Sequence, residues 1–386
     1  MADLFNTVWG QPKVRAFLRA AVAAGRVSHA YLFCGPVGAG KTQAALSFAQ
    51  AVLCPLQQQG AVMAPSEERC GSCPVCRLIR EQKHPDVRFL HPEGAGGYLV
   101  DQIREVVADA ALAPIQAQRK VYLIDRADLL GIQAANAFLK TLEEPPDDVL
   151  IVLLARTKES VLPTLVSRCQ VLPFRTIPEH EAAGIVAQNA AVSLPLARIA
   201  LAAGGGSVTR AVAYMASKEQ QALRAQVLQL LGNLETYDAW NILQACEGLA
   251  LAAKNLAEGS AQNAGAAWEG QADFLDKAQV KTMEQRAKRA AAAAARENLH
   301  RITAVCRSFL RDAMACAAGA SDSLVNEDVR SDVLHLAACC DLASLARSFS
   351  FVDRCEQAIS YNVSAETCLD ALFLELQTCL FRPAGC

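Results

Sequence analysis

The sequence predicts an α/β domain built on a parallel sheet, followed by a region made of helices alone. Short apolar runs alternate with amphipathic stretches over the first 175 residues. Strands that alternate with helices in this way form a parallel sheet covered by helices. After Pro178 no strand pattern recurs, and the Ala-rich sequence that follows favours helix.

The strands are predicted from apolar runs that are too short for buried helices. These runs are residues 30–34, 86–90, 121–125, 150–155 and 170–173. Helical periodicity appears between several of them. Ile103, Val106 and Ala110 are spaced by three and then four positions on one helical face. Ala135, Phe138 and Leu142 show the same spacing on another.

Two prolines, Pro173 and Pro178, mark a predicted domain boundary. The expected division is an α/β domain at 1–175, a small helical domain at 176–217 and a larger helical domain at 218–386. In the last of these, the Gly/Ala/Gln-rich residues 257–272 predict a flexible interruption. A long charged helix is expected to follow, from Asp276 to Met314.

The composition excludes an overall basic protein, because the 37 Lys and Arg residues are balanced by 39 Asp and Glu residues. A local basic face stays possible, since DNA binding depends on where charge sits. The N-terminus shows no secretory pattern, and the apolar run Val149–Ala155 is far shorter than the ~20 residues that span a bilayer. We therefore expect a cytoplasmic protein without a membrane partner, whose 15 cysteines bind metal or pack in cores.

A complete phosphate-binding motif, the P-loop, follows the first predicted strand and opens a helix, the context that the motif requires. It matches G-x-x-x-x-G-K-[ST] with Gly35, Pro36, Val37, Gly38, Ala39, Gly40, Lys41 and Thr42. Its backbone N–H groups can approach phosphates, Lys41 is expected to reach the β- and γ-phosphates, and Thr42 to bind Mg²⁺. The sequence predicts an ATP–Mg²⁺ site; a remnant loop that binds nothing in the cell is the alternative.

A carboxylate that assists Mg²⁺ is expected at the end of another strand, and Asp125 occupies that position. P-loop motors carry a Glu directly after this Asp to polarise the attacking water, but this chain has Arg126. Asp128 lies too far along the chain to approach from the same direction. The site is thus predicted to bind nucleotide and to be poorly equipped for hydrolysis.

A cysteine cluster follows the P-loop helix. Cys70, Cys73 and Cys76 are spaced by two residues each, and Cys54 ends the preceding helix. Four thiolates form the closed tetrahedral shell of structural zinc sites, so residues 54–76 predict a zinc module. Packing is the alternative for these four, and it is the prediction for the eleven other cysteines, which are scattered.

Taken together, these motifs resemble the clamp-loader ATPases of bacterial DNA polymerase III. The segments that carry the resemblance, besides the P-loop and the cysteines, are residues 29–33, 84–86, 101–104, 135–146 and 167–169. It is strong over residues 1–215; beyond them, only 308–312 look similar.

The resemblance implies a RecA-like AAA+ P-loop domain with an inserted zinc module, a helical lid and an all-α collar that assembles a five-subunit ring. It implies as partners the gamma/tau and delta subunits, the sliding clamp and, through the ring, primer-template DNA. Such a chain is part of the DNA-directed DNA polymerase holoenzyme.

Particular residues carry over from the family motifs. Arg168, in Ser-Arg-Cys, is the implied arginine finger that reaches into the ATP site of a neighbouring subunit. Thr157 is the implied first sensor of the γ-phosphate and Arg210 the implied second sensor, each with a structural role as the alternative. Val8 is implied in the adenine pocket. A hydrolysing motor subunit and a stand-alone P-loop enzyme remain alternatives to a subunit that binds ATP with little hydrolysis.

Overall fold

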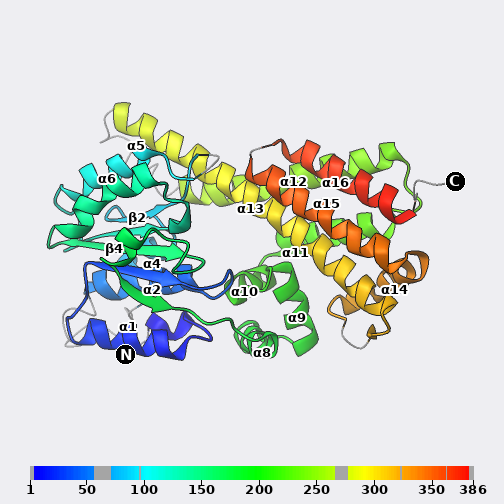
Figure 1. Ribbon diagram of the computed structural model, residues 1–386, viewed down its shortest axis with the longest axis horizontal. Helices are drawn as coiled ribbons and strands as arrows, with labels where there is room; N and C mark the ends of the chain where they lie inside the picture. Colours follow the sequence, from blue (N-terminus) through cyan, green and yellow to red (C-terminus); the bar gives the residue numbers. More distant parts are fainter. Residues whose placement is uncertain are drawn as a thin grey trace. The chain divides into compact units, whose positions relative to one another are not determined.

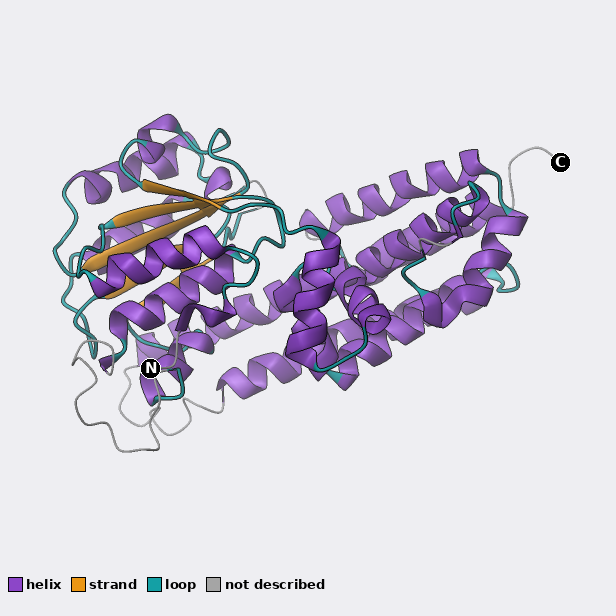
Figure 2. Ribbon diagram, turned by 90° about the horizontal axis from the view of Figure 1, so that it is seen from below, coloured by secondary structure: helices purple, strands orange, loops and turns teal. Residues whose placement is uncertain are grey.

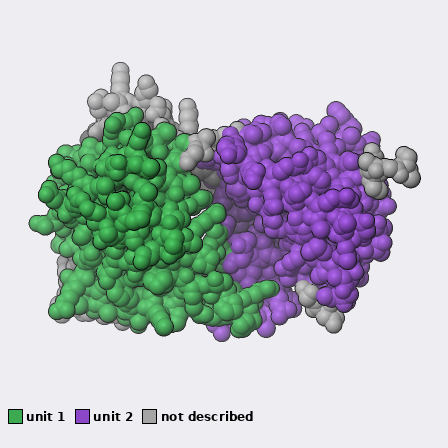
Figure 3. Space-filling view, in the orientation of Figure 1, with its two compact units in different colours: residues 1–185, 207–209 green, residues 186–206, 210–386 purple. Residues whose placement is uncertain are grey.

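The computed structural model describes residues 4–55, 71–94, 97–265, 277–321, 324–361 and 363–381. The chain divides into two compact units (Figure 3). The first unit is Met1–Ile185 with Ser207–Thr209, and the second is Val186–Gly206 with Arg210–Cys386. The predicted division into three domains at 175 and 217 stays a prediction.

The first unit is built on a five-stranded parallel sheet with strand order β2-β3-β4-β1-β5. The strands, orange in Figure 2, are β1 (Ala30–Cys34), β2 (Val87–Leu90), β3 (Lys120–Ile124), β4 (Val149–Ala155) and β5 (Gln170–Pro173). Each predicted strand is confirmed, with ends that shift by at most one residue. No strand follows β5 in the described part of the chain.

Helices cover both faces of the sheet, as Figure 1 shows. One face packs against η1 (Leu4–Thr7), α1 (Pro12–Ala23), α2 (Lys41–Leu53) and α4 (Pro74–Arg80). The other packs against α5 (Val100–Ala110), α6 (Ile132–Glu143) and α7 (Pro163–Val166). Within β1, Tyr31 and Phe33 face the first layer while Leu32 and Cys34 face the second, because side chains alternate along a strand. A strand buried on both faces explains its unbroken apolar run.

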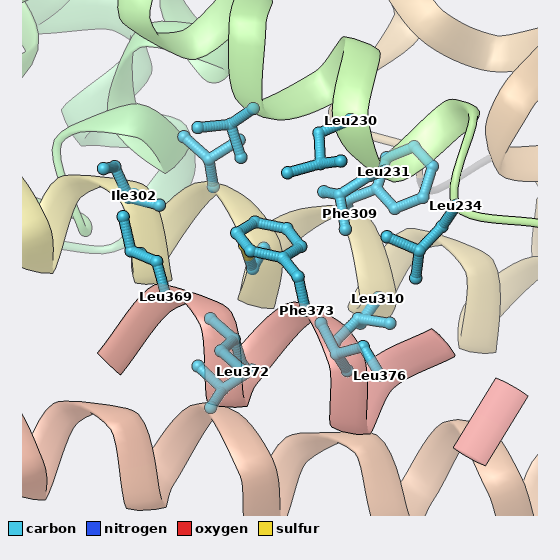
Figure 4. Packing of buried hydrophobic residues seen from close by; sticks show 14 of the residues in the cluster. Leu230, Leu231, Leu234, Ile302, Phe309, Leu310, Leu369, Leu372, Phe373 and Leu376 are labelled. Carbon is cyan, nitrogen blue, oxygen red and sulfur yellow. The ribbon is translucent and has the colours of Figure 1, made fainter. Parts of the chain in front are cut away.

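Helices alone form the second unit in the described residues. They are α9 (Leu194–Ala203), α10 (Val208–Ala216), α11 (Lys218–Gly232), α12 (Ala239–Gly265), α13 (Lys277–Ala317), α14 (Arg330–Cys339), α15 (Leu342–Ser360) and α16 (Ala365–Phe381), with a short η5 (Glu327–Val329). The helix α8 (Glu179–Ala190) spans the division between the units, and α10 also crosses it, because Val208 and Thr209 belong to the first unit. Phe309 of α13 and Phe373 of α16 are buried in the centre of this bundle (Figure 4).

The two long helices α12 and α13 test two expectations about the helical region, of which one is confirmed and the other is partly wrong. The long charged helix is confirmed by α13. The flexible interruption at 257–272 is wrong over residues 257–265, because α12 continues to Gly265; the next eleven positions lie outside the described residues. Ala-rich sequence propagates a helix well, and a single interior glycine costs it only about 1 kcal/mol.

Burial tests the prediction that the scattered cysteines pack. It is confirmed where the side chain is buried: Cys34, Cys246, Cys306, Cys340, Cys355 and Cys368. It is wrong for Cys339, which is exposed, and Cys386 lies outside the described residues.

In the described ranges no single helix has the length and apolar character to cross a membrane, although α8 and α9, bent at 105° to each other, satisfy these measures as a pair.

Candidate functional site

The P-loop leaves the sheet between two strands and turns into a helix. It follows β1, which lies between β4 and β5, and the Gly35 N–H donates to the carbonyl of Ala155 at 3.2 Å. Gly38 and Gly40 have φ of 85° and 83°, values that favour glycine. Gly40 is the N-cap of α2, so the helix N-terminus opens directly onto the loop.

Gly35 also allows a close approach of the backbone. A Cβ atom at this position would lie 2.6 Å from the carbonyl oxygen of Phe174, which follows β5. The Phe174 N–H in turn donates to the Cys34 carbonyl at 2.7 Å. The first glycine of the motif therefore seats the loop against the neighbouring strand.

The side chain of Lys41 folds back over the P-loop. Its ammonium donates to the carbonyls of Gly35 at 2.6 Å and Pro36 at 2.8 Å. Burial lowers its pKa, and the nearby charge of Arg156 acts in the same direction, while the carboxylates of Asp125 and Asp128 oppose this shift. The charges of Asp125, Asp128 and Arg156 therefore all act on the Lys41 ammonium. The sequence analysis did not single out Arg156.

Asp125 and its neighbours form the acidic side of this site. Asp125 follows β3, and its Oδ2 lies 3.3 Å from Nδ1 of His91. Arg126 adopts a left-handed conformation with φ of 49°, and its Nε donates to Oδ2 of Asp128 at 3.2 Å. In the position where a motor has its water-polarising Glu, this chain therefore holds a cation paired with a carboxylate.

Asp128, set aside in the sequence analysis, is only 10% exposed and lies where its charge acts on Lys41. Among the described residues, its Oδ1 atom is a buried oxygen without a hydrogen-bond partner. Buried polar atoms normally have partners. An acceptor of this kind fits a water bound to Mg²⁺, so the residues present fit an ATP–Mg²⁺ complex: backbone N–H groups and Lys41 for phosphates, and Thr42, Asp125 and Asp128 around the metal.

Hydrogen bonds of Gln11, a residue not identified from the sequence, connect the N-terminal segment to the P-loop. Buried Gln11 donates from Nε2 to the carbonyls of Ala39 at 3.1 Å and Arg175 at 2.8 Å, and its Oε1 accepts from the Arg175 N–H at 3.1 Å. No local pattern distinguishes this glutamine, because its partners are remote in sequence. Val8 is buried in the same layer, and its place in an adenine pocket stays a prediction.

Thr157 lies on the chain leaving β4, the strand next to the P-loop strand. Its Oγ1 accepts from the Ser160 N–H at 3.2 Å, and the Ser160 hydroxyl donates to the Thr157 carbonyl at 2.8 Å. This double contact holds the hydroxyl in an exposed turn beyond the carboxyl end of β4. Its role as a γ-phosphate sensor stays a prediction.

Arg168 lies just after α7, remote in sequence from the P-loop, and its side chain is fixed by contacts within its own unit. NH1 donates to the Thr164 carbonyl at 2.8 Å and to the Ser167 hydroxyl at 3.2 Å, while NH2 pairs with Glu143 at the end of α6. The side chain is 32% exposed, so a partly open guanidinium is held at the surface. Glu143, which the sequence analysis did not identify, is the ion-pair partner of this guanidinium. The role of Arg168 as an arginine finger stays a prediction.

Arg210, the implied second sensor, lies on α10 and belongs to the second unit. Burial lowers its pKa, the charge of Glu297 opposes that shift, and Arg301 acts with it. Its role at a nucleotide stays a prediction.

Three of the four predicted zinc ligands come together. Cys54 ends α2, Cys73 caps α4, Cys76 lies within α4, and their sulfur atoms are buried within 4.8 Å of one another. The sulfurs of Cys54 and Cys73 are 3.7 Å apart. Tetrahedral zinc with Zn–S of about 2.3 Å places its sulfurs about 3.8 Å apart, so the spacing fits the metal. Cys70 lies outside the described residues, and zinc itself stays a prediction.

The segment His84-Pro85-Asp86 has a structural role. Buried Asp86 accepts the N–H groups of Ile115, Gln116 and Ala117 at 2.6, 2.7 and 2.8 Å, and its own N–H donates to Nδ1 of His84 at 3.1 Å. One carboxylate thus organises the loop that leads into β3.

Two sequence families match the chain. The family described as DNA polymerase III, delta subunit, matches residues 10–178, and the family described as DNA polymerase III, delta subunit, C terminal, matches residues 266–377. A DNA polymerase III subunit delta' of Bacillus subtilis is 34% identical over 221 residues, which are 57% of this chain and 64% of that protein. This chain belongs to the clamp-loader family of DNA polymerase III gamma/tau and delta-prime subunits.

Other clamp-loader relatives are of the gamma/tau type. The subunit gamma/tau of Mycobacterium tuberculosis is 30% identical over 260 residues, 64% of this chain, and the chain spans only 44% of that protein's length. Among solved structures, a gamma subunit-related protein of Thermotoga maritima aligns with 93% of this chain and 98% of its own, at 19% identity and a TM-score of 0.45.

Proposed function

We propose that this chain is a delta-prime subunit of the clamp loader, a ring component that binds ATP–Mg²⁺, hydrolyses little of it, and supplies Arg168 to a neighbouring ATP site. The proposed partners are gamma/tau and delta subunits, the sliding clamp and, through the assembled ring, primer-template DNA. The work of such a ring is to open the clamp and place it on primed DNA during replication.

The observation that carries this proposal is the pairing of Arg126 with Asp128 beside an intact P-loop. In P-loop hydrolysis, a side chain must orient or activate the attacking water. Arginine cannot accept a proton from that water, since its guanidinium stays charged throughout the physiological range. The residues that bind phosphate are nevertheless complete, so binding and hydrolysis are separable in this chain.

Arg168 supports the second half of the proposal. An arginine finger acts by neutralising charge that grows on the transferred phosphoryl group, and in P-loop proteins it contributes about 10³–10⁵ in rate. The ion pair with Glu143 and the bond to the Thr164 carbonyl pre-orient the guanidinium, which reduces the entropy lost when it binds a phosphate.

The main alternative is a hydrolysing gamma/tau motor, and the complete P-loop favours it as much as it favours delta-prime. Relatives of both types have similar identity: tau of Bacillus subtilis is 38% identical over 180 residues, against 34% over 221 for delta' of the same organism. Arg126 separates the alternatives on chemical grounds. A stand-alone P-loop enzyme would need an acceptor site but would need neither Arg168 nor a ring.

We also propose that Cys54, Cys70, Cys73 and Cys76 bind one zinc ion. The spacing between the described sulfurs supports this assignment. The ion would connect the end of α2 to the start of α4, and so brace the helix whose N-terminus carries the P-loop.

Two measurements on the purified chain test the function directly. We expect isothermal titration to detect ATP–Mg²⁺ binding and a phosphate-release assay to detect negligible turnover. Robust turnover by the lone chain would show that Arg126 does not disable the site, and the motor assignment would replace this one. Absence of ATP binding would leave only a structural role for the P-loop.

A further inference from the structure

A second group of metal-ligating side chains lies in the second unit, far in sequence from the cysteine module. Glu235, in the turn between α11 and α12, meets His335 and Cys339 of α14. Nε2 of His335 is 2.7 Å from Oε2 of Glu235, and Sγ of Cys339 is 3.7 Å from the same Nε2. The three ligand atoms all lie within 4.8 Å of one another.

The helix geometry explains why two of these side chains converge. His335 and Cys339 are four positions apart on α14, so they lie one turn apart on the same face. The turn after α11 brings the carboxylate of Glu235 to that face. Ligands from two separate elements therefore meet, and an ion held there would join the α11–α12 turn to α14.

Cys339 has no packing role that would explain it. Among the cysteines that the structure describes, it is the one classed as exposed. Its neighbour Cys340 is buried and donates its thiol hydrogen to the Leu380 carbonyl at 3.4 Å, as a packing cysteine does. A thiol that instead faces an imidazole and a carboxylate at the surface has the surroundings of a metal ligand.

We propose that Glu235, His335 and Cys339 form a second divalent metal site, with zinc as its fitting ion. One thiolate sulfur, one imidazole nitrogen and one carboxylate oxygen make a donor set typical of zinc, whereas Mg²⁺ and Ca²⁺ prefer oxygen ligands alone. With zinc ligand distances of about 2.0–2.3 Å, tetrahedral geometry places N and S about 3.6 Å apart, close to the 3.7 Å observed.

Binding at this site has a defined proton balance. The Cys339 thiol loses its proton to solvent when the sulfur ligates the ion, and the imidazole proton sits on Nδ1 so that Nε2 can donate its lone pair. The ion replaces the hydrogen bond between His335 and Glu235. Three protein ligands leave a fourth position for water, which makes the site open, unlike the four-cysteine module.

Zinc content of the full-length chain tests the proposal. After equilibrium dialysis against zinc at neutral pH, we expect the wild-type chain to hold one more zinc ion than either His335→Gln or Cys339→Ser. Because the cluster is at the surface, both variants keep the fold. The controls His180→Gln, an exposed histidine elsewhere, and Cys316→Ser, a half-buried cysteine of the second unit, should keep the wild-type content.

Alkylation gives an independent readout at a single residue. Peptide-level mass spectrometry should show that zinc at about ten times its Kd slows modification of Cys339 by N-ethylmaleimide about tenfold, since only the free fraction reacts. That protection should disappear in His335→Gln and in Glu235→Gln, while millimolar Mg²⁺ should give none. Unchanged zinc content in both ligand variants, or alkylation of Cys339 that zinc does not slow, would reduce the cluster to a hydrogen-bonded surface group.

Discussion

In the proposed nucleotide site, one side chain, Arg126, is the residue that we propose separates this chain from a hydrolysing P-loop ATPase. The strand, the loop and the helix N-terminus that a phosphate-binding motif requires are all present, and the charges of Asp125, Asp128 and Arg156 act on Lys41. What differs is the residue beside Asp125, where a cation pairs with Asp128. In this proposed site, nucleotide binding and hydrolysis would therefore depend on different residues.

The first prediction concerns Lys41. Replacing it with Ala should weaken ATP–Mg²⁺ binding by about tenfold or more, because a hydrogen bond to a charged group contributes about 1.5–3 kcal/mol. The matched control is Lys13→Ala, an exposed lysine on α1 that should leave affinity unchanged. Isothermal titration of both variants checks this. Equal affinities would mean that Lys41 does not touch phosphate.

At the scale of elements, a few buried side chains fix how loops meet the sheet. Gln11 fastens the N-terminal segment to the P-loop and to the chain after β5, and Asp86 organises the loop before β3. Both act on backbone groups that are remote in sequence. Their positions set the geometry of the site without touching a ligand.

Asp86 allows a second prediction. In Asp86→Asn, the amide can offer only one acceptor oxygen where the carboxylate accepts three N–H groups, and we expect a loss of about 1–3 kcal/mol. The midpoint of urea denaturation should fall, and amide exchange at residues 115–117 should accelerate. Asp147→Asn, at an exposed aspartate, is the control. Unchanged exchange at 115–117 would contradict the assigned role.

A third prediction concerns the cysteine module. Cys73→Ser should remove one zinc ion per chain and lower the melting temperature, because metal binding is coupled to folding of the module. Elemental analysis and thermal melting check the two effects on the same preparation. Cys169→Ser, outside the module, serves as the control. A wild-type chain that carries no zinc at these cysteines and melts at the same temperature with or without chelator would refute the zinc module.

The elements could be predicted from sequence because their signals are local. An apolar run of about five residues has the length of a typical buried strand and is shorter than a typical helix. The P-loop motif is typical of a strand–turn–helix. Gln11, Arg156 and Glu143 could not be found in this way, since each acts through partners that only the folded chain brings close. The interruption expected at 257–272 is wrong over residues 257–265, because the helix propensity of alanine outweighs the cost of the interior glycine there.

At the scale of the whole molecule, the two units divide the proposed work. The first contains the sheet, the P-loop, the cysteine module and Arg168, and the second is a helical bundle around Phe309 and Phe373. In a ring of subunits, the first unit would bind one nucleotide and act on another, while the bundle would hold neighbours together.

This chain is proposed to deliver chemistry to a neighbouring subunit through Arg168, and the Arg168→Ala variant is the sharpest test of that role. The variant should keep its fold, its zinc content and its own ATP affinity, because Arg168 lies outside the P-loop and its contacts are at the surface. Arg168→Lys should behave like Ala, since a compact ammonium lacks the planar fork of the guanidinium.

The decisive measurement is ATP hydrolysis by a loader reconstituted with gamma/tau and delta subunits, stimulated by clamp and primed DNA. With Arg168→Ala we predict a ring that assembles normally but loses part of its stimulated hydrolysis, because other subunits supply fingers to the remaining sites. A mutant ring that hydrolyses ATP and loads clamps at the wild-type rate would contradict the account and leave Arg168 an ordinary surface residue.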